Sequence, residues 1–182
     1  MENFISKQLI EHCKNGDRRS QKELYLLTID RFRNIGWRYS FNNDDALDIV
    51  QNTYLMIFRS LDKYDDNKGS FYTWSNKIIV NEALQLLRKR SKIMSDDFND
   101  NLYVEHSDMN LEKYTIDEIK RVVGQLNPAH RVIFNMYFFD EFTYREIAEI
   151  LNIKESSTRA NVSRAKKAFL DVWKKIDNSM AL

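Results

Sequence analysis

The sequence has few of the residues that interrupt secondary structure or cross-link a chain. It contains four glycines and one proline in 182 residues, too few for the many turns of an all-β domain. Its single cysteine excludes an internal disulfide framework, and no cysteines and histidines occur at the spacing of a zinc site. We therefore expect a mostly helical protein that needs no metal or other cofactor.

Long apolar runs are also absent. The longest, such as Leu55–Phe58, fall far short of the roughly 18 to 20 residues that span a bilayer, and the N-terminal residues lack the apolar core of a signal peptide. With 43% hydrophobic and 30% charged residues, the chain can bury a core and is not disordered as a whole. We expect a cytoplasmic protein with no segment inserted in a membrane.

The formal net charge of +1 conceals an uneven distribution. Residues 1–92 carry a net charge of +4, residues 93–118 carry −7 and residues 119–182 carry +4. The acidic segment shows no helical or strand period, which is typical of a solvated linker. The sequence therefore predicts two small helical domains, 1–92 and 119–182, joined by an acidic flexible linker over 93–118. The two basic blocks suit DNA as a partner.

Capping residues divide the first block into helices. Residues 15–17 (Asn-Gly-Asp) end a short amphipathic segment and begin a long helix that runs to about Tyr39. The cluster at 42–45 caps the next helix. After a polar loop, Ser70 is the predicted N-cap of a helix over 71–91.

The second block ends in a helix-turn-helix pattern. Asn127-Pro128 is an N-cap followed by proline at the first helical position. Thr143 and Glu146 form a capping box for a short helix that ends near Leu151. The turn 152–154 then leads to a long final helix, which is the geometry of a helix-turn-helix motif.

The final helix has an apolar stripe and an opposite polar face. The predicted buried stripe is Thr158, Val162, Ala165, Phe169, Val172, Trp173 and Ile176. The residues predicted to contact DNA are Ser156, Arg159, Ala160, Ser163, Arg164 and Lys167. Arg159 suits the bidentate contact that guanine offers, while Arg164 and Lys167 suit phosphates. The small Ala148 of the preceding helix lets the two helices approach each other.

Aromatic and basic residues alternate around the start of the helix over 71–91. They are Lys63, Tyr64, Lys68, Phe71, Trp74, Lys77, Asn81 and Arg88. Rings on which an unstacked base can lie, with cations that hold the backbone, suit single-stranded DNA. Aromatic residues at a helix start are also typical of a hydrophobic core, so both interpretations stay open.

Catalysis is not expected. The chain has no glycine-rich phosphate loop and no nucleophile motif, and its three histidines are scattered. Asp44, Asp45 and Asp48 lie beside helix-cap signals that explain them without chemistry. A helical metal-dependent hydrolase that uses these three aspartates is the enzymatic alternative.

Taken together, these stretches resemble the RNA polymerase sigma factors, in particular the small two-domain extracytoplasmic-function group. Residues 45–51 look like the motif that docks on the polymerase, and residues 69–90 are similar to the part that melts and reads the minus-ten element. The domain that reads the minus-thirty-five element is resembled by residues 126–128 with Arg131, by residues 142–151 and by residues 159–166. The resemblance covers almost the whole chain, and the motifs occur in the order of the family.

The resemblance implies an all-α transcription initiation factor that binds core RNA polymerase and promoter DNA and has no enzymatic activity. It assigns polymerase binding to Asp45, Asp48 and Gln51, and it adds an anti-sigma protein as a candidate partner. The alternative is a stand-alone helix-turn-helix regulator, which would bind duplex DNA without polymerase.

Four positions depart from the family pattern. Ser156 replaces the small glycine that often follows the glutamate. Asn152 and Lys154 stand where the family usually has a glycine and a serine. Because Lys154 cannot accept a hydrogen bond, Ser156 or Glu155 is the expected cap of the final helix. Trp74 stands alone where housekeeping members carry two aromatic residues, which implies weaker melting and stricter promoter choice.

Overall fold

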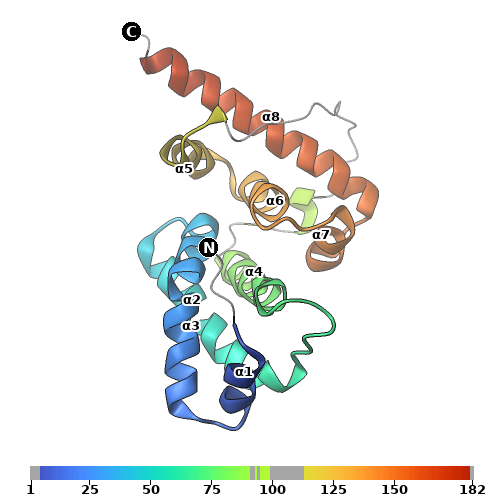
Figure 1. Ribbon diagram of the computed structural model, residues 1–182. Helices are drawn as coiled ribbons and strands as arrows, with labels where there is room; N and C mark the ends of the chain where they lie inside the picture. Colours follow the sequence, from blue (N-terminus) through green and yellow to red (C-terminus); the bar gives the residue numbers. More distant parts are fainter. Residues whose placement is uncertain (1–4, 91–92, 94, 99–112, 181–182) are drawn as a thin grey trace. The chain divides into compact units, whose positions relative to one another are not determined.

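The computed structural model describes residues 5–90, 93, 95–98 and 113–180 (Figure 1). The regular structure of these residues is entirely helical, so the predicted all-α class is confirmed. The chain divides into two compact units, residues 1–86 and 87–182. The division falls inside a helix, ahead of the boundary that the sequence predicted after residue 92, and each unit is described by itself.

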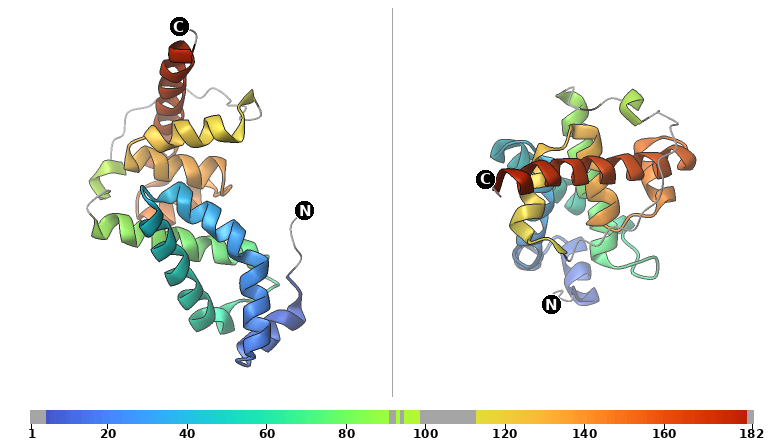
Figure 2. Two further views of the ribbon diagram at one scale, coloured as in Figure 1. Left: turned by 90° about the vertical axis from the view of Figure 1, so that its left-hand side faces the viewer. Right: turned by 90° about the horizontal axis from the view of Figure 1, so that it is seen from above.

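The first unit is built from four helices and one short 3-10 turn. They are α1 (Lys7–Lys14), α2 (Arg18–Tyr39), α3 (Asn43–Ser60), the turn η1 (Leu61–Lys63) and α4 (Phe71–Lys89), of which the last residues belong to the second unit. Figures 1 and 2 show α2 and α3 side by side, and α1 packs against α2 and η1. The described side chains of Leu24, Phe32, Ile49, Ile57, Ile79 and Leu84 are buried between these helices.

The caps lie where the sequence predicted them. The Asp17 side chain accepts hydrogen bonds from the backbone N–H groups of Arg19 and Ser20, and the Asn42 side chain accepts one from Asp45. Ser70 Oγ accepts a bond of 3.1 Å from the Thr73 N–H. The predicted starts of α2, α3 and α4 are therefore confirmed, because each of these caps satisfies N–H groups that have no partner within the helix.

Gly36 sets how closely α2 and α3 approach. A Cβ atom at this position would lie 3.0 Å from the Ala46 carbonyl oxygen and 3.1 Å from Val50 Cγ2. A backbone oxygen cannot swing away as a flexible side chain can, so the helices themselves would have to separate.

Replacing Gly36 with alanine is therefore expected to destabilise the first unit by about 1 to 3 kcal/mol, measured by urea unfolding. Gly124 is the matched control, because the nearest atom to its added Cβ is Arg131 Nη2 at 3.9 Å. Gly124→Ala is expected to stabilise its helix by about 0.5 to 1 kcal/mol. Equal effects at the two positions would contradict the close-contact explanation.

The second unit contains α5 (Ile116–Gln125), α6 (Pro128–Phe138), α7 (Tyr144–Leu151) and α8 (Glu155–Met180). The last helix packs on the other three, with the rings of Phe134 and Phe169 stacked at 4.7 Å. The predicted stripe is confirmed in its first half, since Thr158, Val162, Ala165 and Phe169 are buried. Val172, Trp173 and Ile176 are half-buried.

The segment that the sequence predicted as a solvated linker is structured at both ends. Ile93 and Phe98 are buried, and the short turn η2 (Ser95–Phe98) contacts α8. Asn161 of α8 donates a hydrogen bond of 2.8 Å to the Phe98 carbonyl oxygen. At the other end, Thr115 caps α5. The middle of the predicted linker, residues 99–112, lies outside the described residues.

Candidate nucleic-acid interface

The turn between α7 and α8 closes with a left-handed residue. Asn152 has φ 58° and ψ 50°. Asparagine tolerates this left-handed conformation better than most other residues except glycine. Its N–H donates to the carbonyls of Ala148 and Glu149, and the Ile153 N–H donates to the Ala148 carbonyl at 3.0 Å. Asparagine therefore replaces the family's usual glycine and still ends α7 with its carbonyls satisfied.

Apolar side chains hold the two helices of the motif together. Ile147 and Leu151 of α7 and Val162 of α8 are buried. Ala148 is also buried, and its single methyl group lets α8 pack closely. The predicted helix-turn-helix motif is confirmed.

The DNA-facing residues predicted on α8 differ in their exposure. Ser156, Arg159 and Lys167 are exposed, Ala160 and Arg164 are half-buried, and Ser163 is only 6% exposed. The Arg164 guanidinium donates to Asn161 Oδ1 at 2.7 Å. Base contact by Ser163 stays a prediction, but its hydroxyl presents little surface here.

The start of α8 differs from the expected cap. Glu155 is the first residue of the helix, so Glu155 and Ser156 both lie inside it and Lys154 holds the N-cap position. The Lys154 carbonyl accepts from the Thr158 N–H at 3.0 Å. The Glu155 carboxylate instead accepts a hydrogen bond of 3.0 Å from Arg159.

Arg159 is held in place by two neighbours. Besides its ion pair with Glu155, its guanidinium carbon lies 4.9 Å from the centre of the Tyr144 ring of α7, within the range of a cation–π interaction. Tyr144 in turn stacks on Tyr137 at 5.0 Å, and burial raises the pKa of Tyr144 to about 12. A neutral, fixed ring therefore supports the arginine that is predicted to contact a base.

Arg159→Ala is expected to weaken discrimination at a single base pair by about 1 to 3 kcal/mol. The measurement is selection from a randomised duplex, with the chain bound to core RNA polymerase. Lys167→Ala is the comparison, because an exposed lysine that touches phosphate should weaken all sequences alike. A uniform loss for Arg159→Ala would place its guanidinium on phosphate.

A polar stripe runs along α4. Trp74, Lys77, Asn81 and Arg88 recur at helical spacing on one face, and the last three are exposed. Lys63 and Lys68 are exposed in the preceding segment. The residues predicted to contact single-stranded DNA thus include two exposed cations and an exposed asparagine on one face of α4, with two exposed lysines in the preceding segment.

The aromatic residues at the start of α4 have different environments. Phe71 is 3% exposed, so for this ring the core interpretation is correct. Tyr64 and Trp74 are half-buried and lie 5.4 Å apart, centre to centre. Each also packs against Phe71, at 5.8 Å. Phe71 therefore supports two partly accessible rings.

On α3, the predicted polymerase-binding residues do not share one environment. Asp48 and Gln51 are exposed, whereas Asp45 is 4% exposed and its carboxylate accepts from the Asn42 side chain at 3.1 Å. Leu47 and Leu55, which sequence reasoning missed, are 46% and 53% exposed on the same side of the helix. The sequence could have identified both leucines, because they are apolar residues at helix positions that lie outside the buried stripe of α3.

Neither a metal site nor a membrane span is found in the described part of the chain. No three His, Cys, Asp or Glu side chains there lie close enough together to hold a metal ion. No described helix is sufficiently long and apolar to cross a bilayer. The three aspartates near the start of α3 therefore give no support to the hydrolase alternative.

Comparison with known families matches both units. A model described as Sigma-70 region 2 matches residues 24–93, and a model described as Sigma-70, region 4 matches residues 116–169. The first match contains the stripe of α4, and the second contains the helix-turn-helix motif. The chain belongs to the sigma-70 family of RNA polymerase sigma factors. Helix α1 lies ahead of the matched residues.

Curated relatives include sigma factors named as members of the extracytoplasmic-function (ECF) group. The ECF RNA polymerase sigma factor SigW of Bacillus subtilis is 24% identical over 92% of this chain and 96% of its own length. The ECF RNA polymerase sigma factor SigE of Mycolicibacterium smegmatis is 26% identical over 89% of this chain. The match spans 65% of the length of SigE, just under two thirds.

Two solved structures share the fold. The sigma factor RpoE, in a co-crystal with the anti-sigma factor NepR from Bartonella quintana, has a TM-score of 0.58 and 22% identity, over 84% of this chain and 96% of that one. CnrH, in complex with the cytosolic domain of CnrY, has a TM-score of 0.57 and 17% identity, over 92% and 96% of the two chains.

Proposed function

We propose that this sigma factor binds core RNA polymerase and directs it to a small set of promoters. One observation carries the proposal. The two sigma-70 matches occur in the family order, and each contains an intact candidate for DNA contact, the polar stripe of α4 and the exposed face of α8. The role is one of binding rather than catalysis, and we place it in the cytoplasm with the polymerase.

Each surface has a separate task in this proposal. The exposed start of α8, with Ser156 and Arg159, reads the minus-thirty-five element in the major groove. The stripe of α4 and the ring of Trp74 hold the separated strand of the minus-ten element. The exposed side of α3, with Asp48, Gln51, Leu47 and Leu55, docks on the polymerase.

The charge distribution supports a factor that depends on its partner. The net charge is +1, and the two basic blocks carry only +4 each. Few phosphate contacts give weak binding at physiological salt. The polymerase would supply the remaining affinity, whereas a stand-alone regulator must bind duplex DNA by itself.

Run-off transcription with purified core polymerase tests the proposal. We expect the chain to stimulate transcription from some genomic fragments and to shift no duplex in a gel without core enzyme. Absence of stimulation on every fragment would refute the proposal. Tight binding to a palindromic duplex without polymerase would favour the stand-alone regulator instead.

We also propose an anti-sigma partner. Support comes from the RpoE structure, which contains a protein named as an anti-sigma factor. Exposed apolar side chains on α3, such as Leu47 and Leu55, offer a surface for such a protein, which would then exclude the polymerase. Competition between the product of a neighbouring gene and core polymerase for the chain tests this proposal.

A further inference from the structure

Hydrogen bonds within the loop between η1 and α4, residues 64–70, stabilise its conformation. Asp65 Oδ1 accepts hydrogen bonds of 3.0 Å from the backbone N–H and from the side-chain amide of Asn67. The Lys68 N–H donates to the Asp65 carbonyl at 3.1 Å, which closes a turn. Tyr64 donates its hydroxyl hydrogen to the Gly69 carbonyl at 3.3 Å. The two ends of the loop are thus joined across its base.

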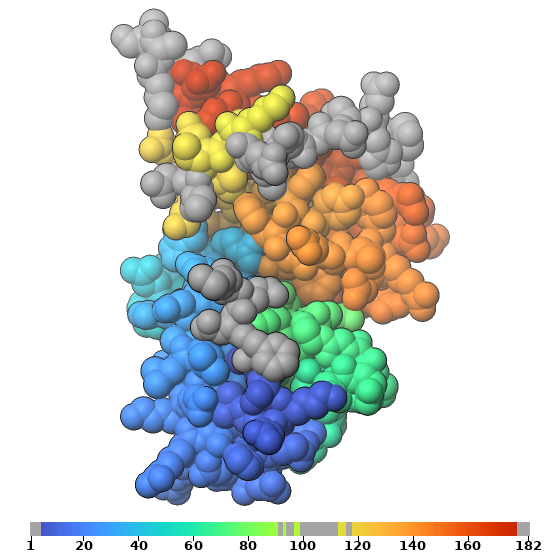
Figure 3. All heavy atoms as spheres, viewed as in Figure 1, coloured from blue at the N-terminus to red at the C-terminus, as the bar shows by residue number. Residues whose placement is uncertain are grey.

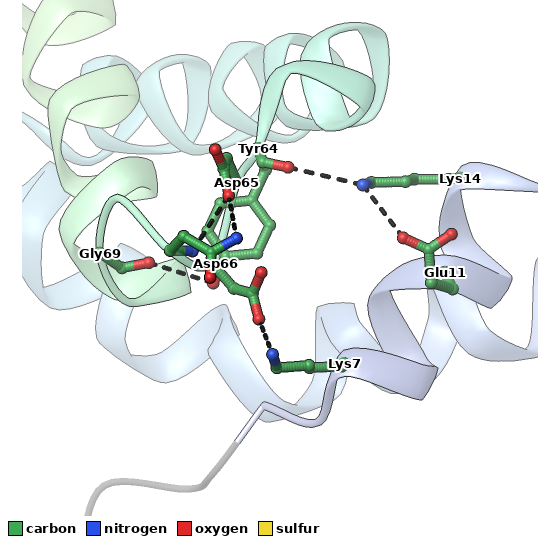
Figure 4. A network of polar contacts seen from close by, with 8 residues as sticks. Lys7, Glu11, Lys14, Tyr64, Asp65, Asp66 and Gly69 are labelled. Carbon is green, nitrogen blue, oxygen red and sulfur yellow. Dashed lines mark hydrogen bonds and ion pairs between the residues drawn. The ribbon is translucent and has the colours of Figure 1, made fainter.

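Helix α1 holds the same loop from outside. The Lys7 ammonium forms an ion pair with the Asp66 carboxylate, and the Lys14 ammonium donates to the Tyr64 carbonyl at 3.5 Å (Figure 4). Glu11 accepts from Lys14 at 3.1 Å and so orients it. Lys7 and Lys14 are two helical turns apart on one side of α1. A single helix therefore contacts the loop both at its start and near its tip.

A cavity of about 420 Å³ lies between α1 and this loop. Its walls include Ile5 and Ile10 on one side and Tyr64, Asn67, Gly69 and Tyr72 on the other. The space-filling view shows the dark-blue surface of α1 next to the green surface of the loop and of the start of α4 (Figure 3). The lysine contacts cross between these walls, so they fix the distance between α1 and the loop.

The contacts of Tyr64 connect this network to the predicted DNA surface. The backbone of Tyr64 receives the Lys14 contact, while its ring packs against Trp74 and Phe71. The same loop carries Lys68. A shift of the loop would therefore move a cation and loosen the support of the Trp74 ring.

We propose that Lys7 and Lys14 are positioning residues for promoter recognition. By holding Asp66 and Tyr64, they fix the loop before α4 and thereby set base selectivity in the single-stranded minus-ten region. The inference rests on the proposed function of the chain. It adds α1, which precedes the residues matched by the region 2 model, to the promoter-reading apparatus.

The two lysines differ in accessibility, and this difference shapes the test. The side chain of Lys14 is 20% exposed, and that of Lys7 is 81% exposed. An exposed lysine can also touch a phosphate directly. A charge exchange with Asp66 separates the two roles, because exchange restores the ion pair but leaves glutamate at the position of Lys7.

The experiment uses the full chain bound to core polymerase. The probe is a fork-junction DNA library with random bases in the single-stranded minus-ten positions, and selectivity is the enrichment ratio of the best to the worst base. Lys7→Glu and Asp66→Lys are each expected to lower this ratio roughly two- to fivefold, the range for an exposed ion pair. The double variant is expected to recover to within about twofold of the wild type.

Lys22→Glu is the matched control, because it makes the same charge change at an exposed position of α2; it is expected to keep the wild-type ratio. Lys14→Met, which keeps an apolar stem, is expected to lower selectivity with unchanged core binding and thermal midpoint.

Additive losses in the double variant, or a uniform loss of binding with no change in the ratio, would overturn the positioning role alone. Failure of the wild-type chain to stimulate transcription would overturn the proposed function itself, so the two failures are distinguishable.

Discussion

Replacing Trp74 with alanine is expected to abolish most promoter opening while polymerase binding stays intact. The Trp74 ring is half-buried against Tyr64 and Phe71, so it is both fixed and partly accessible. Stacking of one base on such a ring contributes about 1 to 3 kcal/mol. Open-complex formation, measured by permanganate reactivity of unpaired thymines, should therefore fall roughly 5- to 150-fold.

Trp74→Phe is the control for this prediction. Phenylalanine keeps a flat ring against Tyr64 and Phe71, so it should retain a large part of the opening activity. If alanine and phenylalanine lowered opening equally, the stacking role would be wrong. If alanine also weakened polymerase binding, the substitution would have damaged the fold of the first unit rather than its DNA surface.

Leu55→Glu is expected to lower the affinity for core polymerase by about 2 kcal/mol or more, roughly 30-fold. The Leu55 side chain is 53% exposed on the side of α3 opposite the core, so the substitution should leave the fold unchanged. A buried apolar contact with the polymerase would be replaced by a carboxylate without a partner. Binding to labelled core enzyme measures the effect.

Lys22→Glu is the control for Leu55→Glu, since it adds an acidic side chain to another exposed site of the same unit. It is expected to leave core affinity within about twofold of the wild type. Unchanged binding by Leu55→Glu, with a normal thermal midpoint, would remove α3 from the docking surface.

Local signals in the sequence were sufficient for several helix boundaries but not for all of them. Asn127 and Thr143 cap α6 and α7 as predicted, because a cap depends on residues within one turn. The same type of signal was overlooked at Thr115 and Glu118, which form a capping box at the start of α5. The linker was therefore predicted to extend too far along the chain.

Environments set by distant parts of the chain were harder to predict. Helical spacing did not reveal that the Asp45 carboxylate accepts a hydrogen bond from Asn42. Nor did it reveal that Phe98, in an acidic segment, is buried and accepts a hydrogen bond from Asn161 at its carbonyl oxygen. The contact of Lys14 with Tyr64 joins residues 50 positions apart. Periodicity identifies the face of a helix but not what covers that face.

For an Arg159 that reads a base as proposed, the arrangement around its side chain affects selectivity and affinity differently. A free arginine loses up to about 2 kcal/mol of side-chain entropy when it is immobilised on DNA. Here Tyr144 and Glu155 have already restricted its rotamers in the folded protein. A guanine that replaces Glu155 as the hydrogen-bond partner gains from this preorganisation. A base that cannot accept two hydrogen bonds from Arg159 offers a weaker partner than Glu155, so the ion pair stays formed. Glu155 would thus compete with DNA for the Arg159 guanidinium. This competition would weaken binding to wrong sequences more than preorganisation strengthens binding to the right one.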